Sequence, residues 1–239
     1  MKRTPGAKMM YLIKRRPQAT REELVVHWFA NHMPWVVEQQ NALARQGKPA
    51  ARKYIATLFD AHPKYGHAWD GMAQLWFDRP LRAPSEPYGT EPKDTFQQKA
   101  QPYVPWATRE YVIMEPGLAV EPLTLNAPFP ATRSGFYKVS FLVKSSPGTD
   151  HDALFAHWLD VHVPNVCSVM DEVGGFGYAV SHSINPAEEP YAGLAELYFP
   201  DEGGWERYKA RIRPDGMERW VEQGGTAILG ARTEMVGIP

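Results

Sequence analysis

The pattern of apolar and polar residues changes its period several times along the first half of the chain. A short apolar run at 9–13 stops at three cationic residues, which favours a strand. Thr20 and Glu23 have the spacing of a capping box, and apolar residues at helical spacing follow them. We expect Pro34 to break or kink this helix near His32, and a second helical stretch, 34–46, to end before Gly47.

The remaining segments of the first half predict strands and one short helix, and the second half repeats their order. The expected elements of the first half are strands 54–59, 72–77 and 110–114 and a short helix within 91–101. Those of the second half are strands 136–143, 176–182, 193–199 and 227–236, a helix from 150 capped by Asp150, and a helix near 203–211. Both halves therefore read β-α-β-β-α-β, which is the ferredoxin-like order.

The chain contains an internal repeat. Residues 11–36 align without a gap with residues 141–166, at an offset of 130, and 9 of the 26 pairs are identical. The match resumes for 70–77 with 192–199 and for 107–112 with 231–236. A repeat of about 110 residues indicates tandem domains rather than a solenoid, whose repeats are far shorter. We expect the copies at 1–115 and 134–239, joined by a proline-rich linker at 116–133.

The two copies together predict the fold class. A four-stranded sheet with helices on one face leaves the other face bare, and that face must be buried. The simplest partner is the other copy. We therefore expect an α+β fold in which two tandem ferredoxin-like units form an intrachain pseudo-dimeric α+β barrel.

Composition and charge limit the partners. The chain of 239 residues has 26 cationic and 27 anionic side chains, so it lacks the excess of basic residues that is typical of proteins that bind nucleic acids. Its apolar runs are too short for a membrane span or a signal peptide, so we expect a cytoplasmic protein without membrane contact. The single cysteine, Cys167, agrees with a reducing compartment. It is read as a small core residue, with a nucleophile as the alternative. Association into a homodimer is possible.

One motif occurs in both copies and carries a family resemblance. His-Trp-x-x-x-His-x-Pro stands at 27–34 and again at 157–164. Asp70-Gly71 precedes an apolar and aromatic strand, whereas the second copy has Ala192-Gly193 there. The pattern resembles the EthD domain of the dimeric α+β barrel superfamily. The resemblance implies a role in xenobiotic breakdown or polyketide-type pathways. Relatives in the superfamily bind aromatic or polyketide ligands between sheet and helices, and they include dehydratases, cyclases, isomerases, cofactor-free monooxygenases and haem proteins.

His32 and His162 are the leading candidates for catalysis. Each follows a tryptophan by four residues on one helical face, and an imidazole on an apolar wall can move protons near neutral pH. A histidine that caps the helix C-terminus is the alternative. Tyr54 and Asp70 are the candidate assisting groups. The candidate substrate-binding residues are aromatic or recur in both copies: Trp28, Trp158, His27, His157, Trp76 and Tyr178. His27 and His157 face another side of the helix, where packing is the alternative role.

Together with the resemblance, which implies an aromatic or polyketide-like substrate, these residues predict a cofactor-free enzyme that acts on such a small compound by acid–base chemistry. Dehydration, cyclisation, isomerisation and C–C lysis remain open, and the first copy is preferred because it has Asp70 where the second has Ala192. No metal is expected, because His27 and His32 are five residues apart rather than four. The alternatives are a non-catalytic binding protein for a hydrophobic intermediate and a haem-binding barrel.

Overall fold

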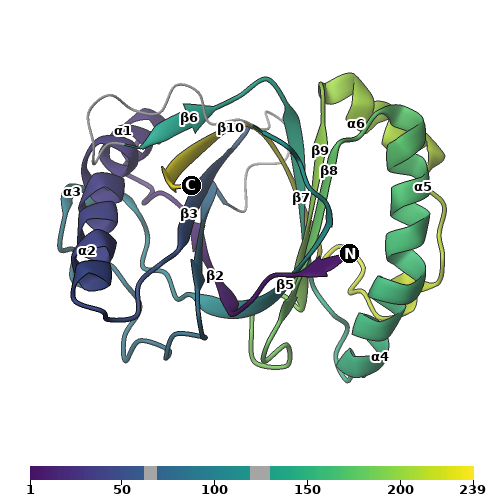
Figure 1. Cartoon of the computed structure of the whole chain (residues 1–239), viewed down its shortest axis with the longest axis horizontal. Coiled ribbons are helices and arrows are strands. Elements are labelled where there is room, and N and C mark those ends of the chain that lie inside the picture. Colours follow the sequence, from purple (N-terminus) through teal and green to yellow (C-terminus); the bar gives the residue numbers. More distant parts are fainter. Residues whose placement is uncertain (62–68, 119–129) are drawn as a thin grey trace. The chain divides into compact units, whose positions relative to one another are not determined.

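The computed structural model describes residues 1–61, 69–118 and 130–239, and these form two compact units. The first unit takes most of its residues from the first sequence copy, and the second unit takes most of its residues from the second copy (Figure 1). The first unit comprises Pro5–Ala107, Leu118–Ser134 and Thr233–Pro239; the second comprises Met1–Thr4, Thr108–Gly117 and Gly135–Arg232.

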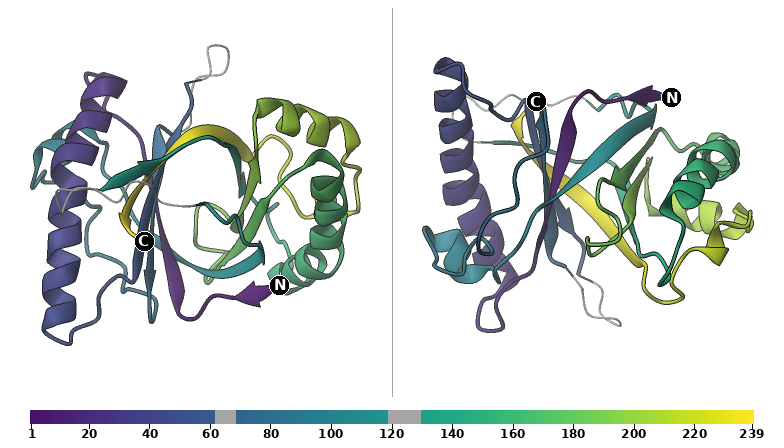
Figure 2. Two further views of the ribbon diagram at one scale, coloured as in Figure 1. Left: turned by 45° about the horizontal axis from the view of Figure 1, so that its top comes forward. Right: turned by 90° about the horizontal axis from the view of Figure 1, so that it is seen from below.

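The first unit is an antiparallel sheet with helices on one face (Figures 1 and 2). Its strands are, in sheet order, β2 (Ala7–Ile13), β4 (Gly71–Phe77), β3 (Lys53–Phe59), the end of β10 (Ala227–Ile238) and β6 (Ala131–Arg133). Its helices are α1 (Arg21–His27), the π-helical turn η1 (Trp28–His32), α2 (Met33–Arg45) and α3 (Thr95–Lys99).

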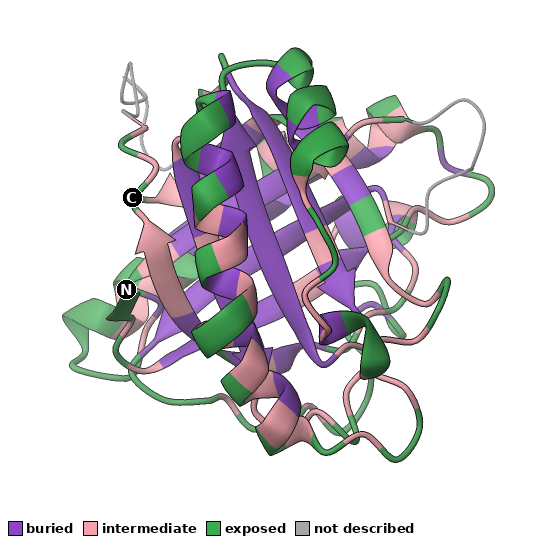
Figure 3. Cartoon of the chain, turned by 90° about the vertical axis from the view of Figure 1, so that its right-hand side faces the viewer, coloured by how far each residue is buried: buried purple, intermediate pink, exposed green. Residues whose placement is uncertain are grey.

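The second unit has the same architecture, and Figure 3 shows its buried strands beneath the helices. Its strands are, in sheet order, β1 (Lys2–Arg3), β5 (Trp106–Met114), β8 (Gly177–Ser183), β9 (Gly193–Phe199), β7 (Tyr137–Val143) and the start of β10. Its helices are α4 (His151–His157), the π-helical turn η2 (Trp158–His162), α5 (Val163–Val173), α6 (Glu202–Arg211) and the short 3-10 helix η3 (Met217–Arg219). Both sequence copies thus have the predicted β-α-β-β-α-β order.

The helix starts are those that the sequence predicts. The Thr20 hydroxyl accepts a hydrogen bond from the Glu23 backbone N–H at 3.1 Å, and the Glu23 carboxylate accepts one from the Thr20 N–H at 2.8 Å. Asp150 caps α4 by accepting from the Ala153 N–H at 3.1 Å. Such caps satisfy amide groups that have no partner within the first turn.

Pro34 does not end the helix, but the helix is irregular near His32, as the alternative of a kink predicts. The chain continues from α1 into α2 through the π-helical turn η1, in which the Met33 N–H bonds to the Trp28 carbonyl. Pro34 occupies the first turn of α2, where its missing N–H costs little. The π-helical turn is wider than an α-helical turn, and the helix continues through it past Pro34. The second copy repeats this at η2.

The compact units do not coincide with the sequence copies. β5 ends the first copy, yet its residues from Thr108 onward pair with β8 in the second unit. β10 ends the second copy, yet its residues from Thr233 onward belong to the first unit. The domain boundaries at 115 and 134 therefore stay predictions about the repeats, and 119–129 of the linker lies outside the described residues.

In each unit, one face of the sheet packs its apolar side chains against the helices. Tyr137, Val139 and Val143 of β7 belong to the core of the second unit. The intervening strand positions point to the other face, where buried charges form ion pairs. Lys138 lies 2.6 Å from Glu196 in the second unit, and Arg133 lies 2.6 Å from Glu234 in the first.

Candidate functional site

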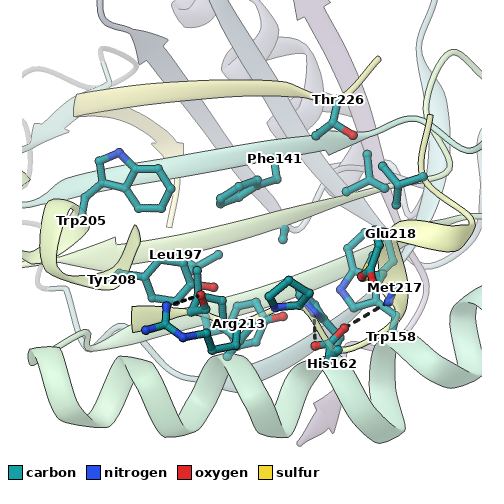
Figure 4. A pocket seen from close by; sticks show the side chains of 18 residues that line it. Phe141, Trp158, His162, Leu197, Trp205, Tyr208, Arg213, Met217, Glu218 and Thr226 are labelled. Carbon is teal, nitrogen blue, oxygen red and sulfur yellow. Dashed lines mark hydrogen bonds and ion pairs between the residues drawn. The ribbon is translucent and has the colours of Figure 1, made fainter. Parts of the chain in front are cut away.

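A cavity lies between the helices and the sheet in each unit, because its lining comes from both. The cavity of the second unit has a volume of about 520 Å³, and that of the first unit about 330 Å³. Figure 4 shows the larger cavity, with Phe141, Trp158, Trp205 and Tyr208 around it. Concave, mostly apolar cavities of this size with a few polar groups are typical of small-molecule sites.

Each cavity is lined by a histidine that is paired with a carboxylate. His162 Nδ1 lies 2.7 Å from Asp215 Oδ2, and His32 Nδ1 lies 2.6 Å from Asp94 Oδ2. An ionised carboxylate only accepts hydrogen bonds, so Nδ1 is the donor in both pairs. Nε2 has no hydrogen-bond partner in either ring within the described part of the chain. In the neutral ring this nitrogen carries the free lone pair and can accept a proton.

The two aspartates stay ionised although they are partly buried. Burial alone would raise the pKa of Asp94, but hydrogen bonds from His32 and the Gln97 N–H lower this pKa below its usual value. Burial likewise opposes the lowering of the Asp215 pKa, which results from hydrogen bonds donated by Asn165 and His162. A carboxylate of this kind orients the imidazole and stabilises its protonated form.

Each cavity also contains a tryptophan beside a tyrosine. In the first unit, Trp28 Nε1 donates to the Tyr54 hydroxyl at 3.3 Å. In the second unit, the equivalent Trp158 and Tyr178 are both buried, and a hydrogen bond from Trp158 acts on the Tyr178 hydroxyl and opposes the rise of its pKa. Burial raises the pKa of Tyr54 and of Tyr178 well above the usual value. Both phenols therefore remain O–H donors at neutral pH.

The two cavities differ in their other aromatic residues. In the first unit Tyr11, Tyr88 and Tyr103 form a cluster with ring centroids 5.8 to 6.4 Å apart. Burial raises the pKa of Tyr11 and of Tyr103. In the second unit, Trp205 and Tyr208 are stacked with centroids 5.6 Å apart. The repeat therefore conserves the histidine, tryptophan and tyrosine of the cavity and varies the residues around them.

The structure brings six of the predicted site residues to the cavities and leaves four outside their linings. The six form two equivalent sets: His32, Trp28 and Tyr54, and His162, Trp158 and Tyr178. Asp70 directly precedes β4. Its carboxylate accepts hydrogen bonds from the Arg15 backbone N–H at 2.8 Å and from the Arg15 guanidinium at 2.7 Å, so it holds the segment that follows β2. Trp76 lies between Lys8 and Lys53, each 5.1 Å from its ring.

The outer histidines also have contacts of their own. His27 Nδ1 lies 3.0 Å from Asn31 Nδ2, outside the cavity lining. His157 packs against Trp220 at 4.9 Å, and its Nε2 lies 3.6 Å from Asp215 Oδ1. His157 therefore contacts the carboxylate of the second pair without lining the cavity.

Sequence reasoning missed both aspartates. Asp94 caps α3, whereas Asp215 lies in the loop after α6, and the segments that carry them do not align. One signal was present. The two aspartates are 215 − 94 = 121 positions apart, close to the offset 192 − 70 = 122 of the preceding matched strands. Continuing the repeat beyond those strands with a gap of one residue pairs them.

Among the described residues there is little support for catalysis by a cysteine nucleophile or by a bound metal ion. Cys167 is half-buried, and burial raises the pKa of its thiol. No group of three or more His, Cys, Asp or Glu in that part of the chain could hold a metal ion. None of its helices is long and apolar enough to cross a membrane.

The two β-α-β-β-α-β units place the chain in the α+β class, and solved structures of similar fold match nearly its whole length. An anthrone oxidase-like protein matches with a TM-score of 0.57 and 9% identity, covering 98% of this chain and 94% of that one. A candidate chlorite dismutase matches with a TM-score of 0.51 and 11% identity, covering 95% and 94%. A variant of the chlorite dismutase from Candidatus Nitrospira defluvii matches with 0.51 and 10%, covering 95% and 91%.

At these identities the likeness shows the fold alone. The predicted class is confirmed: the chain is α+β, with two ferredoxin-like units of the pseudo-dimeric α+β barrel type. No family model matches the chain, and no curated protein matches it. Membership of the EthD family therefore stays a prediction.

Proposed function

We propose that the protein is a cofactor-free enzyme that acts on a small aromatic or polyketide-like compound by acid–base chemistry. The observation that carries this proposal is the histidine–aspartate pair, which occurs twice on the wall of an apolar cavity, with no partner for Nε2 among the residues that the structure describes. Structural roles for His32 and His162 as helix caps are less consistent with this geometry, because Nδ1 of each ring bonds to a carboxylate rather than to a helix carbonyl.

The proposed step is removal of a proton from a carbon that is next to a carbonyl group or conjugated with one through an aromatic ring. Nε2 of the histidine takes the proton, the C–H electron pair becomes the enolate C=C bond, and the carbonyl π pair moves to oxygen. The aspartate stabilises the imidazolium that forms, and the nearby phenol donates a hydrogen bond to the developing oxyanion. Dehydration, cyclisation, isomerisation and C–C lysis all can begin with this step.

Anthrone is a suitable probe for this step. It is a flat aromatic ketone whose methylene protons are acidified by conjugation with the carbonyl, and one structural neighbour is described as anthrone oxidase-like. Its rings match a cavity wall of tryptophan and tyrosine faces. The exchange of its methylene protons for deuterium reports proton removal directly and requires no knowledge of the later steps.

The first test measures this exchange in deuterated buffer without oxygen, by NMR. Wild-type protein is expected to exceed the buffer rate, and the double variant His32→Ala with His162→Ala to lose about 10²-fold or more of the excess. The single variants show which unit is active. His27→Ala and His151→Ala are controls, since neither side chain lines a cavity. Full exchange by the double variant would contradict the proposal, and tight binding of anthrone without exchange would favour a binding protein.

A haem-binding protein is the second candidate, and the residues present fit that group. A histidine that ligates a metal commonly has its other ring nitrogen bonded to a carboxylate, as His32 and His162 have. Arg213 also lines the larger cavity and would pair with a carboxylate of the cofactor. Such a group would supply redox chemistry. A Soret band that appears on titration with haemin, and that His162→Ala removes, would support this candidate.

A further inference from the structure

The two cavities differ at one equivalent strand position. Tyr11 of β2 and Phe141 of β7 are paired in the internal repeat at the offset of 130. Tyr11 lies opposite Ala73 of β4. Phe141 lies opposite Ala195 of β9, so the two rings have the same register. Each ring lines the cavity of its own unit, as Figure 4 shows for Phe141. The first cavity therefore has a phenol where the second has a phenyl ring.

Two more tyrosines lie beside Tyr11 in the first cavity. Tyr88 and Tyr103 are joined by two backbone hydrogen bonds, of 2.8 and 3.0 Å, and both rings contact Tyr11. Burial raises the pKa of Tyr11, and the neighbouring phenols, including Tyr54, raise it further. Because such electrostatic effects weaken with distance, the hydroxyl groups of these four tyrosines lie close together. The first cavity thus contains a cluster of phenol groups.

The hydroxyl groups of this cluster differ in their hydrogen bonds. The Tyr54 oxygen accepts from Trp28 Nε1. The Gln97 side chain hydrogen-bonds to the Tyr103 hydroxyl and opposes the rise of its pKa. The Tyr11 hydroxyl has no hydrogen-bond partner within the part of the chain that the structure describes. Its oxygen is not one of the described unpaired atoms that are sealed from solvent, so a molecule in the cavity can reach it. Tyr11 therefore offers a donor and an acceptor to a ligand.

The first cavity also has an exposed aromatic ring at its edge. Trp35 of α2 lines this cavity and is 49% exposed, and its ring lies 6.1 Å from that of His32. The repeat pairs Trp35 with Asn165, which instead donates to Asp215 and does not line the second cavity. A half-exposed indole offers its face to a flat aromatic ring. The first cavity thus combines an accessible aromatic surface with the Tyr11 phenol.

We propose that the first cavity is a binding site for a flat aromatic compound that carries a second oxygen substituent, and that Tyr11 determines this specificity. Ring contacts lead from His32 through Phe96 and Tyr103 to Tyr11. A planar compound that lies along these rings can therefore place one oxygen at His32 and the other at Tyr11. The proposal rests on the proposed function for the role of His32 and adds a difference in substrate class between the two units.

The Tyr11 hydroxyl selects the ligand through the cost of covering it. A ligand without an oxygen at this position removes water from the hydroxyl and leaves it without a hydrogen bond, whereas an oxygen there restores the bond. Phe141 imposes no such requirement in the second cavity. This difference replaces the preference for the first copy that was drawn from Asp70, because Asp70 is bonded to Arg15 and does not line the cavity.

Two naphthalene derivatives that differ by one hydroxyl group, 2-naphthol and 2,6-dihydroxynaphthalene, are the probes for this site. The indole N–H signals of Trp35 and Trp205 in NMR spectra report on the first and the second cavity, and Trp35→Phe and Trp205→Phe assign them. In wild-type protein, the preference for the diol over 2-naphthol is expected to be about three- to tenfold greater in the first cavity, the value of one neutral hydrogen bond. Equal preferences in the two cavities would overturn the proposal.

The matched variants exchange the two residues at the equivalent position. Tyr11→Phe is expected to remove the extra preference of the first cavity for the diol and to leave its affinity for 2-naphthol unchanged. Phe141→Tyr is expected to increase the preference of the second cavity for the diol. If Tyr11→Phe weakens the binding of both probes equally, or leaves the preference as it is in the wild type, Tyr11 does not determine the specificity.

Stability gives a readout that is independent of any ligand. Tyr11→Phe is expected to leave the melting temperature nearly unchanged, because its hydroxyl has no hydrogen bond to lose among the described residues. Tyr103→Phe removes the bond with Gln97 and is expected to lower it. A loss of stability for Tyr11→Phe as large as that for Tyr103→Phe would give the hydroxyl a structural role and overturn the proposal.

The binding experiments and the anthrone exchange fail independently. If the double variant His32→Ala with His162→Ala retains full exchange while the diol preference depends on Tyr11, the proposed function fails and the specificity of the first cavity stands. If exchange depends on the histidines but the diol preference does not depend on Tyr11, the proposed function stands and this inference fails.

Discussion

Each of the two cavity histidines depends on a carboxylate from a distant part of the chain. His162 and Asp215 are 53 positions apart, and His32 and Asp94 are 62 apart. The aspartates differ in their further donors: Asp94 caps a helix, whereas Asp215 accepts from Asn165 at 2.8 Å and from the Met217 N–H at 3.2 Å. The histidine–aspartate pair is thus common to both units, whereas the groups that hold the aspartate in place differ between them.

The Asp215 carboxylate should contribute to stability in a pH-dependent way. Its pKa in the folded protein is below the usual value, despite the opposing effect of burial, because Asn165 and His162 donate to it. Its contribution is fully present above a pH of about 4, the ordinary pKa of aspartate, and is lost as the pH falls through the lowered pKa. Asp215→Asn is therefore expected to lower the free energy of unfolding by about 1 to 3 kcal/mol at pH 7.

Urea unfolding at neutral pH and at about pH 3, below the usual aspartate pKa, checks this prediction. The difference between Asp215→Asn and the wild type should shrink in acid, because protonation then removes the same charge from the wild type. Asp171→Asn, on the exposed face of α5, is the control and should differ little at either pH. An equal difference at both pH values would show that the charge of Asp215 is not what stabilises the fold.

At the scale of the elements, a glycine in β4 and in β9 sets the position of the cavity tryptophan. A Cβ atom added at Gly193 would lie 2.6 Å from the Ser181 carbonyl oxygen and 3.0 Å from the Trp158 ring. One added at Gly71 would lie 2.7 Å from the Trp28 ring. Both glycines thus allow the indole to lie close against the strand.

Gly193→Ala is expected to displace the Trp158 ring and to destabilise the protein by about 1 to 3 kcal/mol, as in other overpacked cores. Gly203→Ala in α6 is the control for the spectrum. It lies on an exposed helical position, and its Cβ would contact Asp201 and Arg207 rather than the Trp158 ring, so it should leave the position of that ring unchanged. Thermal unfolding and tryptophan fluorescence measure both effects. An unchanged spectrum and melting temperature for Gly193→Ala would contradict this packing argument.

The elements were largely predictable from the sequence, whereas the connections between them were not. The strand at 193–199 and the capping box at Thr20 depend on local patterns, and the structure has both. A break or kink near His32 was predicted, but its form as a π-helical turn was not, since a proline alone does not specify the local hydrogen-bond pattern. Asp94 and Asp215 were missed because a pairing between distant segments leaves no local period. Tyr178 was found through the repeat, but its burial beside Trp158 is a property of three-dimensional packing.

At the scale of the whole molecule, neither sequence copy contains every strand of one unit. The second copy supplies β7, β8 and β9, but the strand beside β8 is β5, which comes from the first copy. Thr108 pairs with Ser183 and Val112 with Ala179 along this edge. Without β5, the second unit would expose the backbone groups of β8.

Two fragments that differ only at their start should therefore differ in stability. Residues 134–239 lack β5, whereas residues 105–239 include it and can complete the sheet beside β8. The longer fragment is expected to unfold at the higher temperature and to stay in solution, because an unpaired strand edge promotes aggregation. Circular dichroism during heating and size-exclusion chromatography compare the two. If residues 134–239 are as stable and as soluble as the longer fragment, the second copy can fold without β5. If they are not, the first copy contributes a structural strand to the unit that holds His162 and Tyr178.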